Sequence, residues 1–135
     1  MGSYKNDPGA GVVVVRKFDD EYRVLGLRLF GRYDLPKGKI EDDEDAITAA
    51  IRETEEEASI SDLKFNWGME TYQTGPITIF LAETCQDPKV IKNPESGIFE
   101  HHGTKWLTWE EAEVSLYTYL RGSIPWAKSI IMNDQ

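Results

Sequence analysis

The chain has 135 residues, of which 40% are hydrophobic and 29% are charged, and its formal net charge is −9. This length and composition are typical of one globular domain and exclude a disordered chain. Its single cysteine, Cys85, excludes an internal disulfide, and no apolar run is long enough to span a membrane. The first residues (MGSYKNDPGAG) lack the apolar stretch of a signal peptide, so we expect a soluble, cytoplasmic protein without a membrane partner.

The first forty residues predict a hairpin followed by a loop. Residues 10–17 (AGVVVVRK) are rich in β-branched side chains and predict a buried strand. Residues 22–30 (YRVLGLRLF) alternate, which predicts a second strand with Leu25 and Leu27 on one face. A proline and a glycine mark residues 35–39 (LPKGK) as a loop.

A helix is predicted for residues 45–58, which contain no glycine or proline. Asp42 or Asp43 can cap its N-terminus. Residues 41–57 contain nine acids and one base, so this segment alone carries a charge of −8, whereas residues 16–39 contain seven bases and four acids. Neighbouring segments of opposite charge favour a site that binds a metal ion and an anion together. Two charged surfaces that face only solvent would give the same pattern.

The second half of the chain predicts further strands and two helices. The predicted elements are strands at 63–72 and 76–83, a long polar loop at 86–97, a strand at 104–107, a helix at 109–120 capped by Thr108, and a helix from Pro125. Strands followed by a helix, more strands and more helices predict an α/β (α+β) sandwich around a mixed sheet, built as one domain over residues 1–135.

Three glutamates of the predicted helix 45–58 lie close together. At about 100° per residue, Glu53, Glu56 and Glu57 share an arc of roughly 100°. The predicted buried stripe beside this arc consists of Ala46, Ile47, Ala50, Ile51, Thr54 and Ala58. Partly desolvated carboxylates at this spacing either raise a pKa or bind a hard cation such as Mg²⁺ or Mn²⁺. An ordinary acidic amphipathic helix is the alternative interpretation.

Residues 38–60 (GKIEDDEDAITAAIRETEEEASI) resemble the Nudix box, the signature G-x5-E-x7-R-E-U-x-E-E-x-G-U of the Nudix hydrolases, where U is a bulky aliphatic residue. The matching residues are Gly38, Glu44, Arg52, Glu53, Glu56, Glu57 and Ile60. Thr54 departs from the signature by replacing an aliphatic residue. Ser59 replaces the glycine that would end the helix with a positive φ. Neither change removes a charged group.

Two other segments extend the resemblance. Residues 33–41 (YDLPKGKIE) are of the family's kind, and residues 100–112 (EHHGTKWLTWEEA) are similar to the E-H-x4-W-L-x2-E-E-A stretch of asymmetric diadenosine tetraphosphate hydrolases. The resemblance implies a Nudix-type α/β/α sandwich that hydrolyses a nucleoside diphosphate linked to another moiety. It further implies Mg²⁺ or Mn²⁺ as cofactor, and diadenosine tetraphosphate or a related dinucleoside polyphosphate as the favoured substrate.

Other functions stay open. Pro76 lies 16 residues past the box, and a proline at about this position is similar to one in ADP-ribose pyrophosphatases. It favours ADP-ribose or another nucleotide sugar as the substrate. A 5′-capped or triphosphate RNA end is a further alternative, but the near-neutral remainder of the chain predicts no nucleic-acid partner. A non-catalytic Nudix-fold nucleotide-binding module is the alternative of another class, although it would be expected to lose box carboxylates. We expect a monomer or a dimer.

Hydrolysis of a pyrophosphate bond requires neutralised phosphate charge, a positioned water and a base. The resemblance implies as metal ligands the carboxylates of Glu53, Glu56, Glu57 and Glu100 and the carbonyl oxygen of Gly38. The candidate bases are Glu53, Glu57 and Glu100, with Glu95 as a weaker candidate. Arg52 is expected to orient one of these glutamates.

Substrate contacts are predicted from charge and aromatic character. Arg28, Lys37 and Lys39 are candidates for phosphate contacts, although each could be a solvated surface residue. The nucleobase requires an aromatic surface, for which the candidates are Tyr72, Tyr33 and Phe99. His101 and His102 could act in catalysis, but neighbouring surface histidines more often have no such role.

Overall fold

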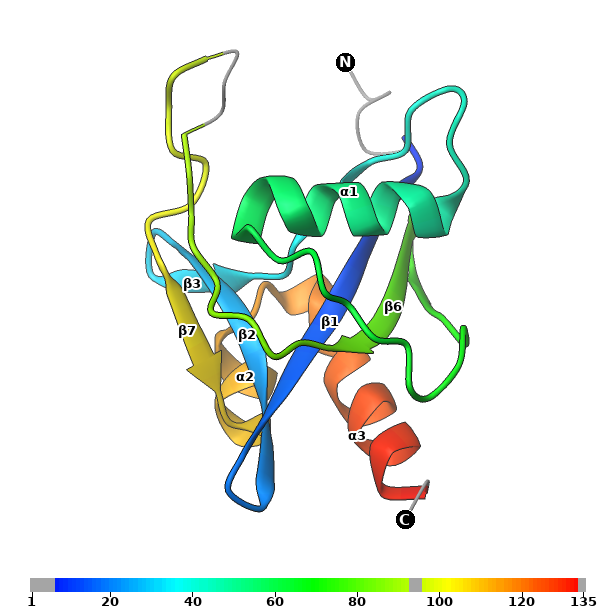
Figure 1. Ribbon diagram of the computed structural model, residues 1–135, viewed down its shortest axis with the longest axis vertical. Helices are drawn as coiled ribbons and strands as arrows, with labels where there is room; N and C mark the ends of the chain where they lie inside the picture. Colours follow the sequence, from blue (N-terminus) through cyan, green and yellow to red (C-terminus); the bar gives the residue numbers. More distant parts are fainter. Residues whose placement is uncertain (1–6, 93–95, 134–135) are drawn as a thin grey trace.

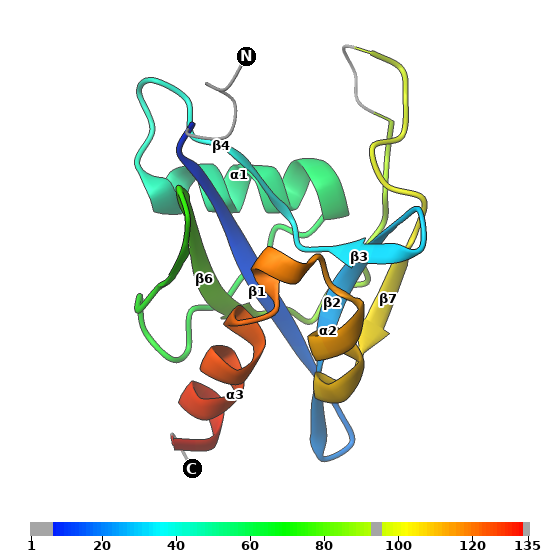
Figure 2. The same cartoon turned by 180° about the vertical axis from the view of Figure 1, so that it is seen from behind.

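The computed structural model describes residues 7–92 and 96–133. A mixed seven-stranded sheet lies between α1 on one face and α2 and α3 on the other (Figures 1 and 2). The strands are β1 (Gly9–Phe18), β2 (Glu21–Leu29), β3 (Arg32–Asp34), β4 (Lys37–Lys39), β5 (Tyr72–Thr74), β6 (Ile77–Glu83) and β7 (Thr104–Leu107). The helices are α1 (Ala46–Ala58), α2 (Trp109–Ser115), the 3₁₀-helix η2 (Thr118–Leu120) and α3 (Ser123–Asn133). The predicted α/β sandwich is confirmed, and no helix among the described residues combines the length and apolarity needed to cross a membrane.

The central strand β1 explains why its sequence is almost continuously apolar. It pairs antiparallel with β2 and β4 along one edge and parallel with β6 along the other. Its Val13 and Val15 pack toward α2 and α3, whereas Val12 and Val14 pack toward α1. A strand that is buried on both faces carries apolar side chains at successive positions. The alternation predicted for β2 is also confirmed, since Leu25 lies in the core on the α1 side.

Helix α1 covers almost the predicted residues 45–58, but a different aspartate caps it. Asp45 is its N-cap, with an extended backbone and a side-chain oxygen that accepts a hydrogen bond from Thr48 N at 3.0 Å. The prediction of Asp42 or Asp43 as the cap is wrong, because only Asp45 lies three residues before that free amide. The helix ends at Ala58, and the left-handed backbone of its C-cap Ser59 (φ 59°) confirms the predicted positive φ.

The buried side of α1 is turned toward its glutamates. Ala49 is fully buried, whereas Ile51 of the predicted stripe is 40% exposed, so that part of the prediction is wrong. Small alanine side chains allow α1 to lie close to the sheet, and close approach outweighs the apolar area of one isoleucine. At the helical step, Glu57 lies almost directly two turns beyond the buried Ala50. Glu57 therefore points in the direction of the buried face, with a half-buried side chain at the edge of the core.

Three predicted elements differ from the structure because tertiary pairing competes with local preference. The strand predicted at 63–72 is reduced to a single bridge between Lys64 and Glu83, and β5 begins only at Tyr72. The loop predicted at 35–39 contains β4, which pairs with β1. The helix predicted at 109–120 ends at Ser115, because the chain then pairs with β3 through a bridge at Leu116. Thr108 is its N-cap as predicted, with a complete capping box.

Candidate active site

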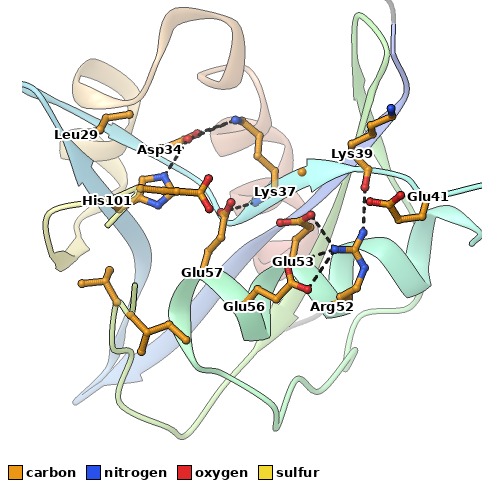
Figure 3. A pocket seen from close by; sticks show the side chains of 14 residues that line it. Leu29, Asp34, Lys37, Lys39, Glu41, Arg52, Glu53, Glu56, Glu57 and His101 are labelled. Atoms are coloured by element: carbon orange, nitrogen blue, oxygen red, sulfur yellow. Dashed lines mark hydrogen bonds and ion pairs between the residues drawn. The ribbon is translucent and has the colours of Figure 1, made fainter. Parts of the chain in front are cut away.

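One cavity of about 720 Å³ gathers most of the residues that the sequence singled out. It is lined by β4 with its flanks, by α1, by the segment between β6 and β7, and by the last residues of β2 and β3 (Figure 3). The lining residues are Leu29, Asp34, Lys37, Gly38, Lys39, Glu41, Arg52, Glu53, Glu56, Glu57, Val90, Ile91, Glu100 and His101. All five expected metal-ligand residues are among them.

Arg52 is the centre of the polar contacts along α1 (Figure 3). Its Nε and Nη2 donate to the two carboxylate oxygens of Glu44 at 2.6 and 2.9 Å, and Nη2 also donates to the carbonyl of Lys39 at 3.0 Å. Its Nη1 contacts Glu53 Oε2 at 2.9 Å and Glu56 Oε1 at 3.3 Å. Hydrogen bonds from Arg52 and from the backbone N–H of Glu41 lower the pKa of Glu44 to about 2. The geometry suits an arginine that orients carboxylates.

Glu57 and Glu53 are carboxylates in a poorly solvated position. Burial raises the pKa of Glu57 to about 9, although Lys37 N donates to its Oε1 at 3.1 Å. The negative charges of Glu53 and Asp34 add to this rise. Burial also raises the pKa of Glu53, and the bond from Arg52 only partly offsets it. Two carboxylates with elevated pKa values on one helix face favour a bound cation.

The carboxylates do not converge on a single point as they stand. Within residues 7–92 and 96–133, no three acidic, histidine or cysteine side chains are spaced to hold an ion. Arg52 Nη1 contacts both Glu53 and Glu56 and so supplies the positive charge between them. The donor set nevertheless fits a hard divalent cation, since it consists of carboxylate oxygens on one cavity wall.

Gly38 allows Glu53 to approach β4. A Cβ on Gly38 would lie 2.1 Å from the carboxyl carbon of Glu53, and this distance is too short for any side chain at position 38. The carbonyl oxygen of Gly38 is directed at β1, where it lies 3.1 Å from the position that a Cβ on Gly9 would occupy. The structure thus explains the glycine by close approach, and a metal-ligand role for its carbonyl stays a prediction.

Sequence reasoning missed Asp34, which is only 7% exposed and connects two walls of the cavity. Its carboxylate accepts from Leu35 N at 2.9 Å, lies 3.2 Å from Lys37 Nζ and contacts His101 Nε2 at 3.3 Å. His101 is itself 6% exposed, so it is not the surface residue that its sequence context suggested. The acid directly before Leu35-Pro36-Lys37 was the signal available in the sequence.

Lys37 lies at the boundary between two cavities and contacts Tyr119, which sequence reasoning missed. Burial lowers the pKa of Lys37, but Asp34 and Tyr119 outweigh burial and raise it overall, so Lys37 is charged. Its Nζ lies 5.7 Å from the centroid of the Tyr119 ring. A second cavity of about 220 Å³ shares Lys37, Gly38 and Lys39 with the first. This second cavity is otherwise lined by Asp7, Pro8, Gly9 and Ile77.

Two predicted substrate contacts lie elsewhere. Arg28 does not line either cavity, and its Nη2 donates to the carbonyl of His102 at 3.2 Å. The alternation of β2 places it on the sheet face opposite Leu27, which packs toward α1. Tyr72 packs on Trp126 with ring centroids 5.9 Å apart, away from the cavity linings.

The remaining aromatic candidates lie outside the cavity lining as well. Tyr33 packs partly buried against the core on the α2 and α3 side. Phe99 is partly exposed, and Lys92 Nζ lies 5.9 Å from its ring centroid. Glu95 lies outside the described residues. Neither Tyr33 nor Phe99 has a contact that assigns it a role in the site.

Comparison with known proteins gives consistent matches. Residues 5–127 match the family model of the NUDIX domain. The Ap4A hydrolase of C. elegans, in a binary complex, is similar in structure with a TM-score of 0.76 and 26% identity, over 93% of this chain and 98% of that chain. A NUDIX-type protein of Listeria monocytogenes gives a TM-score of 0.75 at 19% identity, over 94% of this chain and 96% of that chain. The NUDIX domain of Shewanella oneidensis NrtR, complexed with ADP ribose, gives a TM-score of 0.66 at 14% identity, over 93% of this chain and 88% of that chain. No curated protein sequence matches the chain.

Proposed function

The chain belongs to the NUDIX family, a family of hydrolases, and on this premise we propose that it hydrolyses a pyrophosphate bond in dinucleoside polyphosphates such as diadenosine tetraphosphate. One observation carries the proposal: four glutamates line a single cavity together with two lysines of β4. The glutamates are Glu53, Glu56, Glu57 and Glu100, and the lysines are Lys37 and Lys39. Because every charged position of the signature is filled, and all of them except Glu44 line the cavity, an enzyme is favoured over a module that only binds nucleotides.

Glu53, Glu56, Glu57 and Glu100 would hold divalent cations, for which we propose Mg²⁺ or Mn²⁺. Such a cation, when bound, neutralises phosphate charge and polarises a phosphoryl oxygen. Arg52 holds Glu53 and Glu56 in place, and Lys37 and Lys39 can pair with phosphate oxygens. A glutamate accepts a proton from water, the water oxygen attacks phosphorus, and the anhydride P–O bond breaks to release a nucleotide. We assign the proton transfer to Glu100.

A two-ended polyphosphate suits the shape of the site. Lys37 and Lys39 lie between a large and a small cavity, so a phosphate chain along β4 could place a group in each. The relative that is 26% identical is named an Ap4A hydrolase, whereas the ADP-ribose complex is 14% identical and shows the fold alone. Pro76 follows Gly75 (φ 54°) in the turn between β5 and β6, which gives that proline a structural explanation.

The substrate and the cleaved bond can be tested together. With Mg²⁺ or Mn²⁺, we expect diadenosine tetraphosphate to be split asymmetrically into ATP and AMP, because carboxylates fixed to one helix grip one part of the chain. Chromatography of the products, with reaction in ¹⁸O-labelled water, should place the label on one product only. Two ADP molecules as products would overturn the asymmetric cleavage, and a kcat/KM for ADP-ribose about tenfold higher than for the tetraphosphate would overturn the substrate, but neither outcome would contradict the NUDIX chemistry. Cleavage of capped or triphosphate RNA alone would have the same consequence.

Replacement of Glu100 should separate turnover from binding. In Glu100→Gln we expect kcat to fall by about a hundredfold or more while KM changes little, because proton transfer belongs to the transition state. Glu95→Gln is the control and should retain the wild-type rate. The opposite ranking would transfer the role to Glu95, and two variants with wild-type rates would leave the base on α1.

A further inference from the structure

The residue that ends α1 is unusual for its backbone conformation. Ser59 has φ 59° and ψ 33°, the left-handed region that glycine adopts without cost and serine does not. The family signature has glycine at this position, so the serine carries a conformational cost that the signature avoids. A contact of the serine side chain, which glycine could not make, would offset this cost.

The Ser59 side chain makes such a contact. Its Oγ donates to the carbonyl oxygen of Lys89 at 2.9 Å, and Lys89 N donates back to the carbonyl of Ala58 at 2.8 Å. These two bonds join the end of α1 to the segment that follows β6 (Figure 1). Ser61 N adds a third bond between the same segments, to Gln86 Oε1 at 2.7 Å.

The segment held by Ser59 leads directly into the wall of the large cavity. Val90 and Ile91 follow Lys89, and together with Leu29 they supply the apolar side chains of a lining that is otherwise mostly charged. Val90 also packs against the core on the α1 side, whereas Ile91 is 46% exposed. A nucleobase or ribose placed against these side chains would bury apolar area.

The other end of this segment is fixed independently of Ser59. Arg28 and the chain at 102–103 exchange two backbone hydrogen bonds of 2.8 Å, from Arg28 N to Gly103 O and from His102 N to Arg28 O. His101 is held by Asp34. Loss of the Ser59 bond should therefore disturb Val90 and Ile91 without displacing Glu100.

We propose that Ser59 is a positioning residue that fixes Val90 and Ile91 as the wall contacting the nucleoside moiety of the substrate. This inference rests on the proposed nucleotide hydrolysis. Ser59 acts through that wall and touches neither the cleaved bond nor the cations. It should therefore affect the KM for nucleotide substrates and not kcat.

The substitution Ser59→Gly tests the proposal because stability and binding should change in opposite directions. Glycine relieves the backbone cost, so the Tm should stay equal or rise, whereas KM should increase about three- to tenfold with kcat within about twofold. Hydrogen exchange of the Lys89 amide, measured without nucleotide, should become faster. Ser129→Ala is the matched control, because Ser129 Oγ donates to the carbonyl of Trp126 at 2.9 Å on α3 and should leave KM unchanged.

A double substitution tests whether Ser59 acts through Ile91. Ile91→Ala should raise KM by itself, and adding Ser59→Gly should raise it little further, because the two changes disturb one contact. Fully independent effects on KM, or an unchanged KM in an active Ser59→Gly variant, would overturn the inference. A wild-type protein that cleaves no nucleotide would instead refute the proposed function, on which this inference depends.

Discussion

Glu57→Gln should lose about a thousandfold or more of its turnover and still fold. Glutamine keeps an oxygen that can accept the hydrogen bond from Lys37 N, at 3.1 Å in the wild type, so the local structure should persist. What is lost is the negative charge on the buried face of α1, which a divalent cation requires. Steady-state assays at saturating Mg²⁺, together with circular dichroism, measure both effects. Wild-type turnover in this variant would show that the proposed carboxylate site is wrong.

The same substitution should change how stability depends on pH. Burial raises the pKa of Glu57 from its ordinary 4.5 to about 9 in the folded protein. Between these values the folded state holds a proton that the unfolded chain has released, so this group's contribution to stability falls as pH rises. In metal-free buffer, the Tm of the wild type should fall relative to that of Glu57→Gln between about pH 6 and 9.

A divalent cation should reverse this trend, since it favours the ionised carboxylate. Added Mg²⁺ should therefore raise the wild-type Tm most at the alkaline end of the range and raise the Tm of Glu57→Gln little. Calorimetry of both proteins, with chelator and with Mg²⁺, provides the four curves that are needed. Equal slopes for the two proteins in chelator would contradict a buried, protonated Glu57.

Arg52→Lys should show that the guanidinium geometry matters as well as the charge. A lysine ammonium cannot bridge Glu44 and Glu53 while also donating to the carbonyl of Lys39. We expect turnover to fall about a hundredfold, because misplaced carboxylates lose the productive geometry. Stability should fall by about 1–3 kcal/mol, less than for a fully buried pair because Arg52 is partly exposed.

Arg16→Lys is the matched control for this substitution. Arg16 pairs with Asp87 at 2.7 Å, but the Asp87 side chain is 92% exposed, so the exchange should cost under about 0.5 kcal/mol and leave turnover unchanged. Urea unfolding and steady-state kinetics of both variants provide the comparison. If both substitutions had equally small effects, the contacts of Arg52 would be ordinary surface ion pairs without a role in the site.

The helical part of the site could be predicted from sequence because a helix converts spacing directly into shared direction. Glu53, Glu56 and Glu57 follow from this rule alone, and all three line the cavity. Partial desolvation of the acids was expected from their place beside the stripe, but the direction of Glu57 toward the buried face could not be predicted, because the stripe was assigned from apolar residue types. Close packing against the sheet instead selected Ala49 and exposed Ile51.

Contacts between distant segments account for the other differences. Asp34 connects two walls of the cavity only because the fold brings His101 beside it, and nothing in the local sequence specifies that contact. The alternation of β2 correctly separated Arg28 from Leu25 and Leu27. It could not say which of the two faces would meet α1, so the phosphate contact expected of Arg28 was assigned without that information.

The position of β1 has a consequence for the order in which the molecule can fold. β1 and β2 are joined by a tight turn, so their pairing closes a short loop, whereas the parallel pairing of Gly9 with Ile77 must close a very long one. Helix α1 packs on the β1 side chains Val12 and Val14, next to β6. A chain with only the β1–β2 hairpin formed would still leave Glu57 in water with an ordinary acidity. The proposed affinity for cations would therefore depend on the completed topology and should appear only as the native structure forms during refolding.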